Sequence, residues 1–460
     1  MKTFGKAKHI HLVGIGGIGM SGIAELLLNL GYTVSGSDIK STEVTAHLSD
    51  LGGSVFLGHS PRNIRGADVV VFSSAVRNDN PELIEARQNA IPVIPRAEML
   101  AELMRLKYGI AVAGSHGKTT TTSMIASILT KGGLDPTVVI GGRLNIWGGS
   151  NARLGNSDFL VAEADESDGS FLALSPSIAV ITNIDREHID FYQSMNNLRE
   201  TFVNFINKVP FYGRAILCLD DSEVQGLLPR LKKSYLTYGL TPQSDLRADE
   251  VSKEGLSTHF IVYLRDKVAG KATISTPGDH NVLNALAAIG VGIELEIDFE
   301  SIKEGLKDFG GLTRRFEIKD EKNGILFLDD YGHHPTEIVK TIGAAKECWP
   351  HRRLVVVFQP HRYTRTKDLY DKFVVSFNQA DYLIITPLYG AGEEPLPGVD
   401  SEFLYRGIRD HGHRAITLCA NKEESISHLL TELNSGDVVL TLGAGDIHLV
   451  GTELLKRMAS

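Results

Sequence analysis

Short apolar runs alternate with longer stretches of mixed polarity along most of the chain. The runs are rich in branched side chains and end in glycine or polar residues, as strands buried in a parallel sheet do. The predicted strands are 10–13, 32–34, 69–72, 92–94, 110–113, 159–161, 178–181, 215–219, 325–328, 354–358, 382–385 and 438–440. The stretches 97–106, 118–129 and 281–289 predict helices, and the polar stretch 244–258 predicts hairpins and turns. This alternation favours parallel sheets covered by helices.

The succession of strand, glycine turn and helix starts again at Gly109 and near Gly310. A chain of 460 residues is also longer than a single hydrophobic core usually supports. We therefore predict three α/β domains in series, with residues 1–107, 108–312 and 313–460.

Composition narrows the class of protein. The hydrophobic fraction of 42% and the charged fraction of 22% are those of an ordinary globular protein. The net charge of −9 argues against a nucleic-acid partner, because neutralising phosphates requires a basic surface. The 3 cysteines have no CxxC spacing, which suits a reducing compartment. We find no signal-peptide pattern and no apolar run near the roughly 20 residues of a membrane helix, so we expect a cytoplasmic protein without membrane insertion. We separately expect a monomer or a homodimer.

The run 114–119, Gly-Ser-His-Gly-Lys-Thr, joins a predicted strand to a predicted helix. Backbone N–H groups converge at such a turn and the helix dipole adds positive potential, so an anion binds there. Lys118 would reach the outer phosphates of ATP, and the Thr119 hydroxyl would bind Mg²⁺. A full Walker loop has glycine where this chain has Val112, which leaves a plain turn with a solvated lysine as the alternative. Four threonines at 119–122 favour function, because β-branched residues are poor helix formers.

Acidic residues follow the next predicted strand. Glu163, Asp165, Glu166 and Asp168 lie within six residues, at the strand end where α/β sheets hold ligands. Carboxylates suit Mg²⁺. A solvated acidic turn is the alternative. His188, which follows the strand 178–181, is a further metal candidate, although a lone histidine is more often structural.

A second glycine loop, 14–19, has the GxGxxG pattern between a strand and a helix, and Asp38 follows the next strand. The pattern by itself indicates a dinucleotide-binding domain and hence an NAD-dependent dehydrogenase. The loop requires only a diphosphate at a helix N-terminus, however, and a UDP-sugar carries one as well. Ser73 and Ser74 could add hydroxyl donors to that diphosphate.

Two polar clusters mark the third domain. Residues 329–337 contain two aspartates, a tyrosine and two histidines between a strand and a helix. Residues 359–366 are basic and aromatic, which suits a carboxylate or phosphate ligand, with a solvated loop as the alternative. We interpret the turn 443–446 as structural.

Taken together, these motifs resemble those of the Mur ligases, over the whole chain. The matching segments are 14–22, 114–122, 163–168, 183–188, 278–281, 314–316, 329–337 and 358–366. Within the family, segment 361–366 is most similar to that of members that add L-alanine to UDP-N-acetylmuramate. Members that attach a tripeptide to the same sugar nucleotide are the nearest alternative, and a dehydrogenase or a non-catalytic nucleotide-binding regulator are more distant ones.

The resemblance implies an ATP-dependent ligase of peptidoglycan precursor synthesis that uses ATP and Mg²⁺ and forms an acyl phosphate. It implies a Rossmann-like first domain that binds the UDP-sugar, a central P-loop ATPase-like domain, and a Rossmann-like third domain that binds the amino acid. The implied residues are, for catalysis, Lys118, His188 and Arg315; for ATP, Gly114, Ser115, His116, Gly117, Lys118, Thr119, Thr120, His280, Asn281, Arg315 and Asp330; for the UDP-sugar, Gly14, Gly16, Gly17, Ile18, Gly19, Asp38, Ser73 and Ser74; for L-alanine, Tyr331, His333, His361, Arg362 and Arg365; and for magnesium, Thr119, Glu163 and His188.

Overall fold

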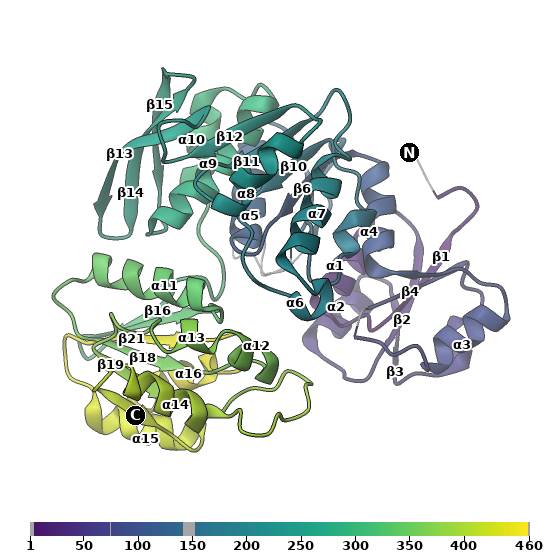
Figure 1. Ribbon diagram of the computed structural model, residues 1–460. Helices are drawn as coiled ribbons and strands as arrows, with labels where there is room; N and C mark the ends of the chain where they lie inside the picture. Colours follow the sequence, from purple (N-terminus) through teal and green to yellow (C-terminus); the bar gives the residue numbers. More distant parts are fainter. Residues whose placement is uncertain (1–3, 74, 141–151, 459–460) are drawn as a thin grey trace. The chain divides into compact units, whose positions relative to one another are not determined.

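A computed structural model describes residues 4–73, 75–140 and 152–458, so Ser74 lies outside the described residues. The chain forms two compact units. One contains the chain up to Val251 together with His259–Ile274 and Asn281–Gly310. The other contains Ser252–Thr258, Ser275–His280 and the chain from Gly311 onward. Three sheets with flanking helices follow one another along the chain (Figure 1), which confirms the prediction of three α/β domains in series.

The first sheet has five parallel strands in the order β3-β2-β1-β4-β5. Leu12 and Ile23 belong to the core on one face, whereas Val13, Val70 and Leu83 belong to the core on the other, so the sheet is covered on both sides. Its elements are β1 (His9–Val13), α1 (Ile18–Asn29), β2 (Thr33–Asp38), α2 (Glu43–Asp50), β3 (Ser54–Leu57), β4 (Val69–Phe72), α3 (Pro81–Gln88), β5 (Val93–Pro95) and α4 (Arg96–Arg105), with a 3-10 helix at Pro61–Ile64.

The second sheet has ten strands in the order β15-β14-β13-β12-β11-β10-β6-β9-β7-β8. Its strands are β6 (Tyr108–Ala113), β7 (Thr137–Val139), β8 (Ala152–Arg153), β9 (Phe159–Glu163), β10 (Ile178–Ile181), β11 (Arg214–Cys218), β12 (Tyr235–Gly239), β13 (Leu246–Glu254), β14 (Ser257–Leu264) and β15 (Lys267–Ile274). Its helices are α5 (Lys118–Lys131), α6 (Ile189–Tyr192), α7 (Met195–Ile206), α8 (Ser222–Leu227), α9 (Asp279–Glu294) and α10 (Phe299–Asp308), with 3-10 helices at Ser170–Ala173 and Leu228–Arg230. The predicted hairpin region is confirmed in β13 and β14. The tight turn into β15 has positive φ at Arg265 and Asp266, as a two-residue hairpin turn requires.

The third sheet has the order β16-β17-β21-β18-β19-β20. Leu326 and Leu328 of β17 belong to one core and Ile325 and Phe327 to the other, so this sheet too is covered on both faces. Its elements are β16 (Glu317–Lys322), β17 (Ile325–Asp330), α11 (Pro335–Cys348), β18 (Leu354–Phe358), α12 (Tyr363–Asp368), α13 (Tyr370–Phe373), β19 (Tyr382–Ile385), α14 (Ser401–Asp410), β20 (Ile416–Leu418), α15 (Lys422–Glu432), β21 (Val438–Leu442) and α16 (His448–Arg457).

The edge strand β16 was not among the predicted strands. Its sequence, EIKDEK, is polar and mostly exposed, and it pairs antiparallel with β17. A charged edge strand has no apolar run by which to recognise it, because only one of its edges is paired and little of it is buried. The charged side chains of such a strand also prevent its free edge from pairing with other chains.

Close packing fixes the position of α5. A Cβ at Gly305 of α10 would lie 2.6 Å from Ile128 Cα, so the two helices approach at backbone distance. Ser127 Oγ also donates a 2.7 Å hydrogen bond to the carbonyl of Gly305. α5, the helix that follows the 114–117 loop, is therefore held in position by α10. Among the described residues, no helix is long and apolar enough to cross a membrane.

A buried carboxylate lies within the first domain. Glu82 of α3 is fully buried and accepts hydrogen bonds from Ser37 Oγ at 2.5 Å and from Asn63 Nδ2 at 2.6 Å. His11 Nε2 lies 3.6 Å away and His59 Nδ1 3.3 Å away. Burial alone would raise the pKa of Glu82, but the contacts with His11, Ser37 and Asn63 outweigh it and lower the pKa to about 2.

We expect this network to stabilise the first domain in a pH-dependent way. A carboxylate with a lowered pKa stabilises the fold above its unfolded pKa of 4.5, and that contribution is lost as the pH falls toward 2. Glu82→Gln should lower stability at pH 7 by about 2 kcal/mol, and the difference from the wild type should narrow between pH 5 and pH 3. Hydrogen exchange of the β1 and β2 amides measures this. Glu85→Gln, on the same helix, is the control, and a Glu82→Gln difference that does not change with pH would refute the assignment.

Candidate functional site

The loop that joins β6 to α5 turns within four residues. Gly114 has a φ of +131° and Gly117 a φ of +81°, a region of backbone space that favours glycine. A Cβ at Gly114 would lie 2.2 Å from Thr182 Oγ1, and a Cβ at Gly117 would lie 2.4 Å from Asn284 Oδ1. Glycine is therefore required at both positions, for its conformation and for the space it leaves.

The end of β10 braces this loop. The backbone carbonyl of Asn183 accepts from the Ser115 N–H at 3.0 Å, and its side-chain oxygen accepts from the His116 N–H at 2.9 Å. The Thr182 hydroxyl and the Asn183 amide both donate to the His116 carbonyl, at 2.6 and 3.0 Å. The Ser115 hydroxyl accepts from the Asp185 N–H at 2.8 Å. The turn is thus rigid just before a helix N-terminus, which is the arrangement that binds phosphate.

Lys118, the first residue of α5, is held over this turn. Its Nζ donates to the Gly114 carbonyl at 2.6 Å and lies 2.9 and 2.8 Å from the two carboxylate oxygens of Glu166. Burial by itself would lower the pKa of Lys118, but the adjacent Glu166 carboxylate outweighs it and raises the pKa. The ammonium is therefore charged and positioned where a phosphate oxygen could take the place of Glu166. Thr119 and Thr120 follow in the first turn of α5.

An acidic group with a histidine lies in the same domain. The ligand atoms of Glu166, Glu187 and His188 all lie within 4.8 Å of one another. The carboxylates are ligands that Mg²⁺ prefers, and their spacing fits a single divalent ion. Glu163, which the family resemblance implies as a ligand, is not in this group but ends β9 opposite Val112 of β6. His188 itself has a φ of +56°, a strained backbone at a candidate site.

The predicted adenine side depends on α9. Asn284 accepts a 3.2 Å hydrogen bond from Thr121 Oγ1 of α5 and donates a 3.1 Å hydrogen bond to Asn281 Oδ1. Asn281 is therefore tied to the phosphate-loop helix through Asn284. His280 precedes it, and burial together with the positive charge of Lys340 lowers its pKa to about 4, so its imidazole is neutral at pH 7.

The first glycine loop has its own supports. The Ser37 carbonyl accepts from the N–H groups of Gly14 at 2.8 Å and Ile15 at 3.1 Å. The Asp38 carboxylate accepts from the Gly16 N–H at 2.9 Å. A Cβ at Gly14 would lie 3.3 Å from the Ser73 Cβ. The structure thus brings Asp38 and Ser73 to this loop, whose Gly17 precedes α1, the helix that begins with Ile18 and Gly19.

At the carboxyl ends of the third sheet, two neighbouring arginines differ in their contacts. Arg314 Nε lies 2.9 Å from Asp329 Oδ2, and its guanidinium donates to the carbonyls of Gly443 and Gly445 at 2.6 and 3.0 Å. Arg314 therefore fastens the 443–446 turn to β17. Arg315 lies 3.5 Å from Glu337 Oε1, and its guanidinium carbon is 5.1 Å from the centre of the Tyr331 ring.

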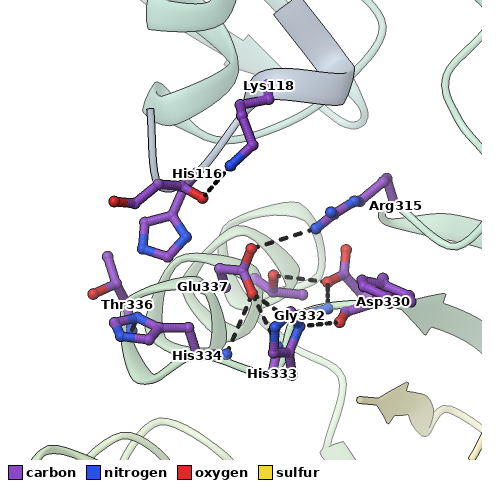
Figure 2. Close-up of polar contacts among 12 residues, drawn as sticks. His116, Lys118, Arg315, Asp330, Gly332, His333, His334, Thr336 and Glu337 are labelled. Atoms are coloured by element: carbon purple, nitrogen blue, oxygen red, sulfur yellow. Dashed lines mark hydrogen bonds and ion pairs between the residues drawn. The ribbon is translucent and has the colours of Figure 1, made fainter. Parts of the chain in front are cut away.

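Glu337 and Asp330 organise the turn between β17 and α11. Glu337 accepts from the backbone N–H groups of His333 and His334 at 3.0 and 3.2 Å (Figure 2). Asp330 accepts from the N–H groups of Gly332 and Phe316, each at 2.7 Å. Burial raises the pKa of Asp330 to about 6 although Arg315 opposes it. This carboxylate is therefore mostly charged at pH 7, and it takes up its proton in a higher pH range than an ordinary aspartate does.

Four of the residues predicted to bind the amino acid, Tyr331, His333, His361 and Arg365, lie together. The fifth, Arg362, follows His361 directly and is exposed. The ring of His333 lies edge-on to that of His361, with centroids 5.5 Å apart, and Arg365 Nη1 is 3.2 Å from His361 Nδ1. Burial is the main cause that lowers the pKa of His333 to about 3 and that of His361 to about 4. Both imidazoles are therefore neutral at pH 7. The positive charge of this cluster therefore comes from the arginines rather than from the histidines.

Family models match the chain in each of its three domains. Residues 9–108 match the Mur ligase family catalytic domain, residues 112–292 the Mur ligase middle domain, and residues 314–445 the Mur ligase, glutamate ligase domain. The chain belongs to the Mur ligase family.

Individual members of the family are similar to this chain over nearly its full length. The chain is 59% identical over 455 residues to the UDP-N-acetylmuramate–L-alanine ligase of Geotalea daltonii, covering 99% of each chain. It is 60% identical to the enzyme of that name from Geobacter sp. strain M21, covering 99% of this chain and 98% of the relative. Among solved structures, the UDP-N-acetylmuramate-alanine ligase of Thermotoga maritima matches with a TM-score of 0.83 at 30% identity, covering 98% of this chain and 99% of the other. A murein peptide ligase from Psychrobacter arcticus matches with a TM-score of 0.70 at 26% identity, covering 98% and 99%.

Some residues of these sites received no role from the sequence. Asn183 and Glu187 lie within the matching segment 183–188, whereas Asn284 lies outside every motif, and the fold brings these residues to the loop or to the acidic group. Glu166 stood out only as one of an acidic run. An asparagine that braces a distant turn has no local signal, because its partner lies about 70 positions away, as for Asn183 and His116.

We expect Gly117→Ala to damage nucleotide binding more than folding. The substitution combines a positive φ, which costs about 1–2 kcal/mol, with a collision against Asn284 at the phosphate loop. Gly133→Ala is a matched control, because Gly133 has a similar φ of +75° and no atom within 4 Å of its Cβ position. Thermal unfolding should show a loss for both variants, larger for Gly117→Ala because of the collision with Asn284, whereas calorimetric ADP affinity should fall at least about tenfold for Gly117→Ala alone. Equal ADP affinities would contradict the role of this loop.

Proposed function

We propose that this protein joins L-alanine to the carboxylate of UDP-N-acetylmuramate in an ATP-dependent reaction of peptidoglycan precursor synthesis. The observation that supports this most strongly is the phosphate-binding turn 114–118, in a chain about 60% identical over nearly its full length to ligases of that name. We place the reaction in the cytoplasm, where nucleotide sugars are made and where free cysteines such as Cys218 remain reduced.

The reaction has two steps. A carboxylate oxygen of the muramyl group attacks the γ-phosphorus of ATP and ADP leaves, which forms an acyl phosphate. The amine of L-alanine then attacks the acyl carbon, loses a proton, and expels inorganic phosphate from a tetrahedral intermediate. Neither step needs a covalent enzyme intermediate, so the protein acts by positioning the reactants and stabilising charge.

The residues divide this work among the domains. The 14–19 loop with Asp38 binds the diphosphate and ribose of the sugar nucleotide, and the 114–120 loop binds the triphosphate. Lys118 exchanges Glu166 for phosphate oxygens and neutralises charge that develops during transfer. His280 and Asn281 border the adenine. From the third domain, Arg315 contributes positive charge toward phosphate and Asp330 contributes a carboxylate toward ribose.

Magnesium is part of this proposal. Glu166, Glu187 and His188 would hold it, with Thr119 and Glu163 as the further ligands implied by the family resemblance. When bound, Mg²⁺ would neutralise phosphate charge and align the γ-phosphate with the attacking carboxylate.

Release of inorganic phosphate tests the proposal. Steady release should require ATP, UDP-N-acetylmuramate and L-alanine together. Release with a tripeptide in place of L-alanine would instead favour the recycling ligases of the family. Nicotinamide reduction, or nucleotide binding without turnover, would refute the proposal.

Removing the lysine ammonium should separate the two nucleotide sites. We expect Lys118→Ala to lower kcat by about a thousandfold or more, because a charge that stabilises the transferring phosphate is lost, while UDP-N-acetylmuramate affinity stays within about twofold. Lys131→Ala, at the other end of α5, is the control. A folded Lys118→Ala protein that no longer binds the sugar nucleotide would contradict the assignment of the two loops.

Removing a guanidinium from the third domain should affect the amino acid. Arg362→Ala should raise the KM for L-alanine about tenfold to a hundredfold, since a charge-assisted pair with the carboxylate is lost. The KM for ATP should change little. Arg406→Ala, which removes an exposed guanidinium paired with Glu402, is the control. Equal rises in both KM values for Arg362→Ala would exclude a specific role.

A further inference from the structure

Tyr389 contacts the proposed amino-acid site although it lies outside every motif described above. Its ring lies nearly parallel to the His361 imidazole, with centroids 5.6 Å apart and an interplanar angle of 8°. The geometry is that of two stacked rings. Tyr389 is 42% exposed, so part of this residue remains accessible to solvent.

Backbone hydrogen bonds place the two rings together. The Tyr389 N–H donates to the Pro360 carbonyl, and the Arg362 N–H donates to the Tyr389 carbonyl, each at 2.8 Å. His361 and Tyr389 thereby form a short parallel bridge between the segments that follow β18 and β19. The stack is set by the fold of these two segments rather than by side-chain choice alone.

The loop that carries Tyr389 is fixed at its far end as well. Glu393 accepts from the Thr364 N–H at 3.1 Å and from its hydroxyl at 2.6 Å. A tight turn closes the loop, with the Glu393 N–H donating to the Gly390 carbonyl at 3.0 Å. A Cβ at Gly390 would lie 3.0 Å from the Tyr363 ring. Both ends of the loop are thus joined to the 360–364 segment.

Gly445 leaves the space that the tyrosine ring needs. A Cβ at Gly445 would lie 3.0 Å from Tyr389 Cγ and 2.3 Å from Gln359 Oε1. The 443–446 turn, held by Arg314, therefore limits where the Tyr389 ring can lie. The 443–446 turn therefore has a structural role besides ending strand β21, because it leaves space for the Tyr389 ring.

His361 in turn contacts Arg365 through Nδ1 and His333 through its ring edge. The plane of the imidazole decides both contacts. We propose that Tyr389 is a positioning residue of the amino-acid site, which holds the His361 imidazole against Arg365 and His333 and so sets the affinity for L-alanine. This inference rests on the proposed function for the identity of the amino acid, but the His361–Tyr389 stack itself can be tested without turnover.

Steady-state kinetics of four variants test whether Tyr389 acts through His361. Tyr389→Ala should raise the KM for L-alanine about threefold to tenfold, the size of a lost aromatic stack, with kcat and the KM values for ATP and sugar nucleotide within about twofold. Tyr389→Phe keeps the ring and should behave as the wild type. Tyr389→Ala combined with His361→Ala should be no worse than His361→Ala alone. Additive effects, a Tyr389→Phe defect equal to that of Tyr389→Ala, or equal rises in all KM values would overturn the proposal.

An NMR measurement of the His361 ring and a variant at Gly445 test the stack independently of Tyr389 kinetics. In histidine-labelled protein, the His361 ring-proton signal, assigned from His361→Ala, should be shifted by the tyrosine ring current in wild type and Tyr389→Phe and should lose that shift in Tyr389→Ala. If the His361 signal is the same in Tyr389→Ala as in the wild type, the stack is refuted. If the signal differs but the wild-type enzyme does not use L-alanine as a substrate, only the proposed function is refuted. Gly445→Ala, which crowds the ring, should also raise the KM for L-alanine, and Gly226→Ala, with no atom within 4 Å of its Cβ position, should not.

Discussion

The constraint on which the central domain depends is the absence of a side chain at two positions of one turn. Gly114 and Gly117 allow the backbone to reverse against Thr182, Asn183 and Asn284, and no larger residue fits against these neighbours. Asn183 accepts from the His116 N–H and donates to the His116 carbonyl, so the backbone just before the helix N-terminus keeps a fixed position. Packing of α10 onto α5 at backbone distance holds that helix in place.

The central domain and the third domain differ in how their charged side chains are paired. In the central domain Lys118 is already paired with Glu166, so under the proposed function a nucleotide phosphate would compete with a carboxylate for the ammonium. In the third domain the histidines near the proposed amino-acid site have lowered pKa values and are neutral, because burial disfavours the imidazolium. Guanidinium groups, which stay charged at any physiological pH, supply the positive charge there.

Much of the fold follows from short-range patterns, and the details of the sites do not. Buried parallel strands appear in the sequence as apolar runs, and glycine turns before helices mark both nucleotide loops, so three α/β domains could be predicted. The charged edge strand 317–322 could not, since nothing apolar marks it. The roles of Asn183, Asn284 and Tyr389 depend on partners distant in sequence or on side-chain contacts across loops, and only the folded chain brings these together. The assignment of substrates needed the family, because a glycine loop binds any diphosphate.

In the proposed reaction, phosphate transferred at the 114–118 turn activates the muramyl carboxylate. Oxygen-18 placed in that carboxylate reports whether this transfer occurs. If an acyl phosphate forms, turnover with ATP and L-alanine should place one labelled oxygen in the inorganic phosphate released, and Lys118→Ala should abolish the transfer. Phosphate released without label, at the same rate as product formation, would exclude an acyl phosphate.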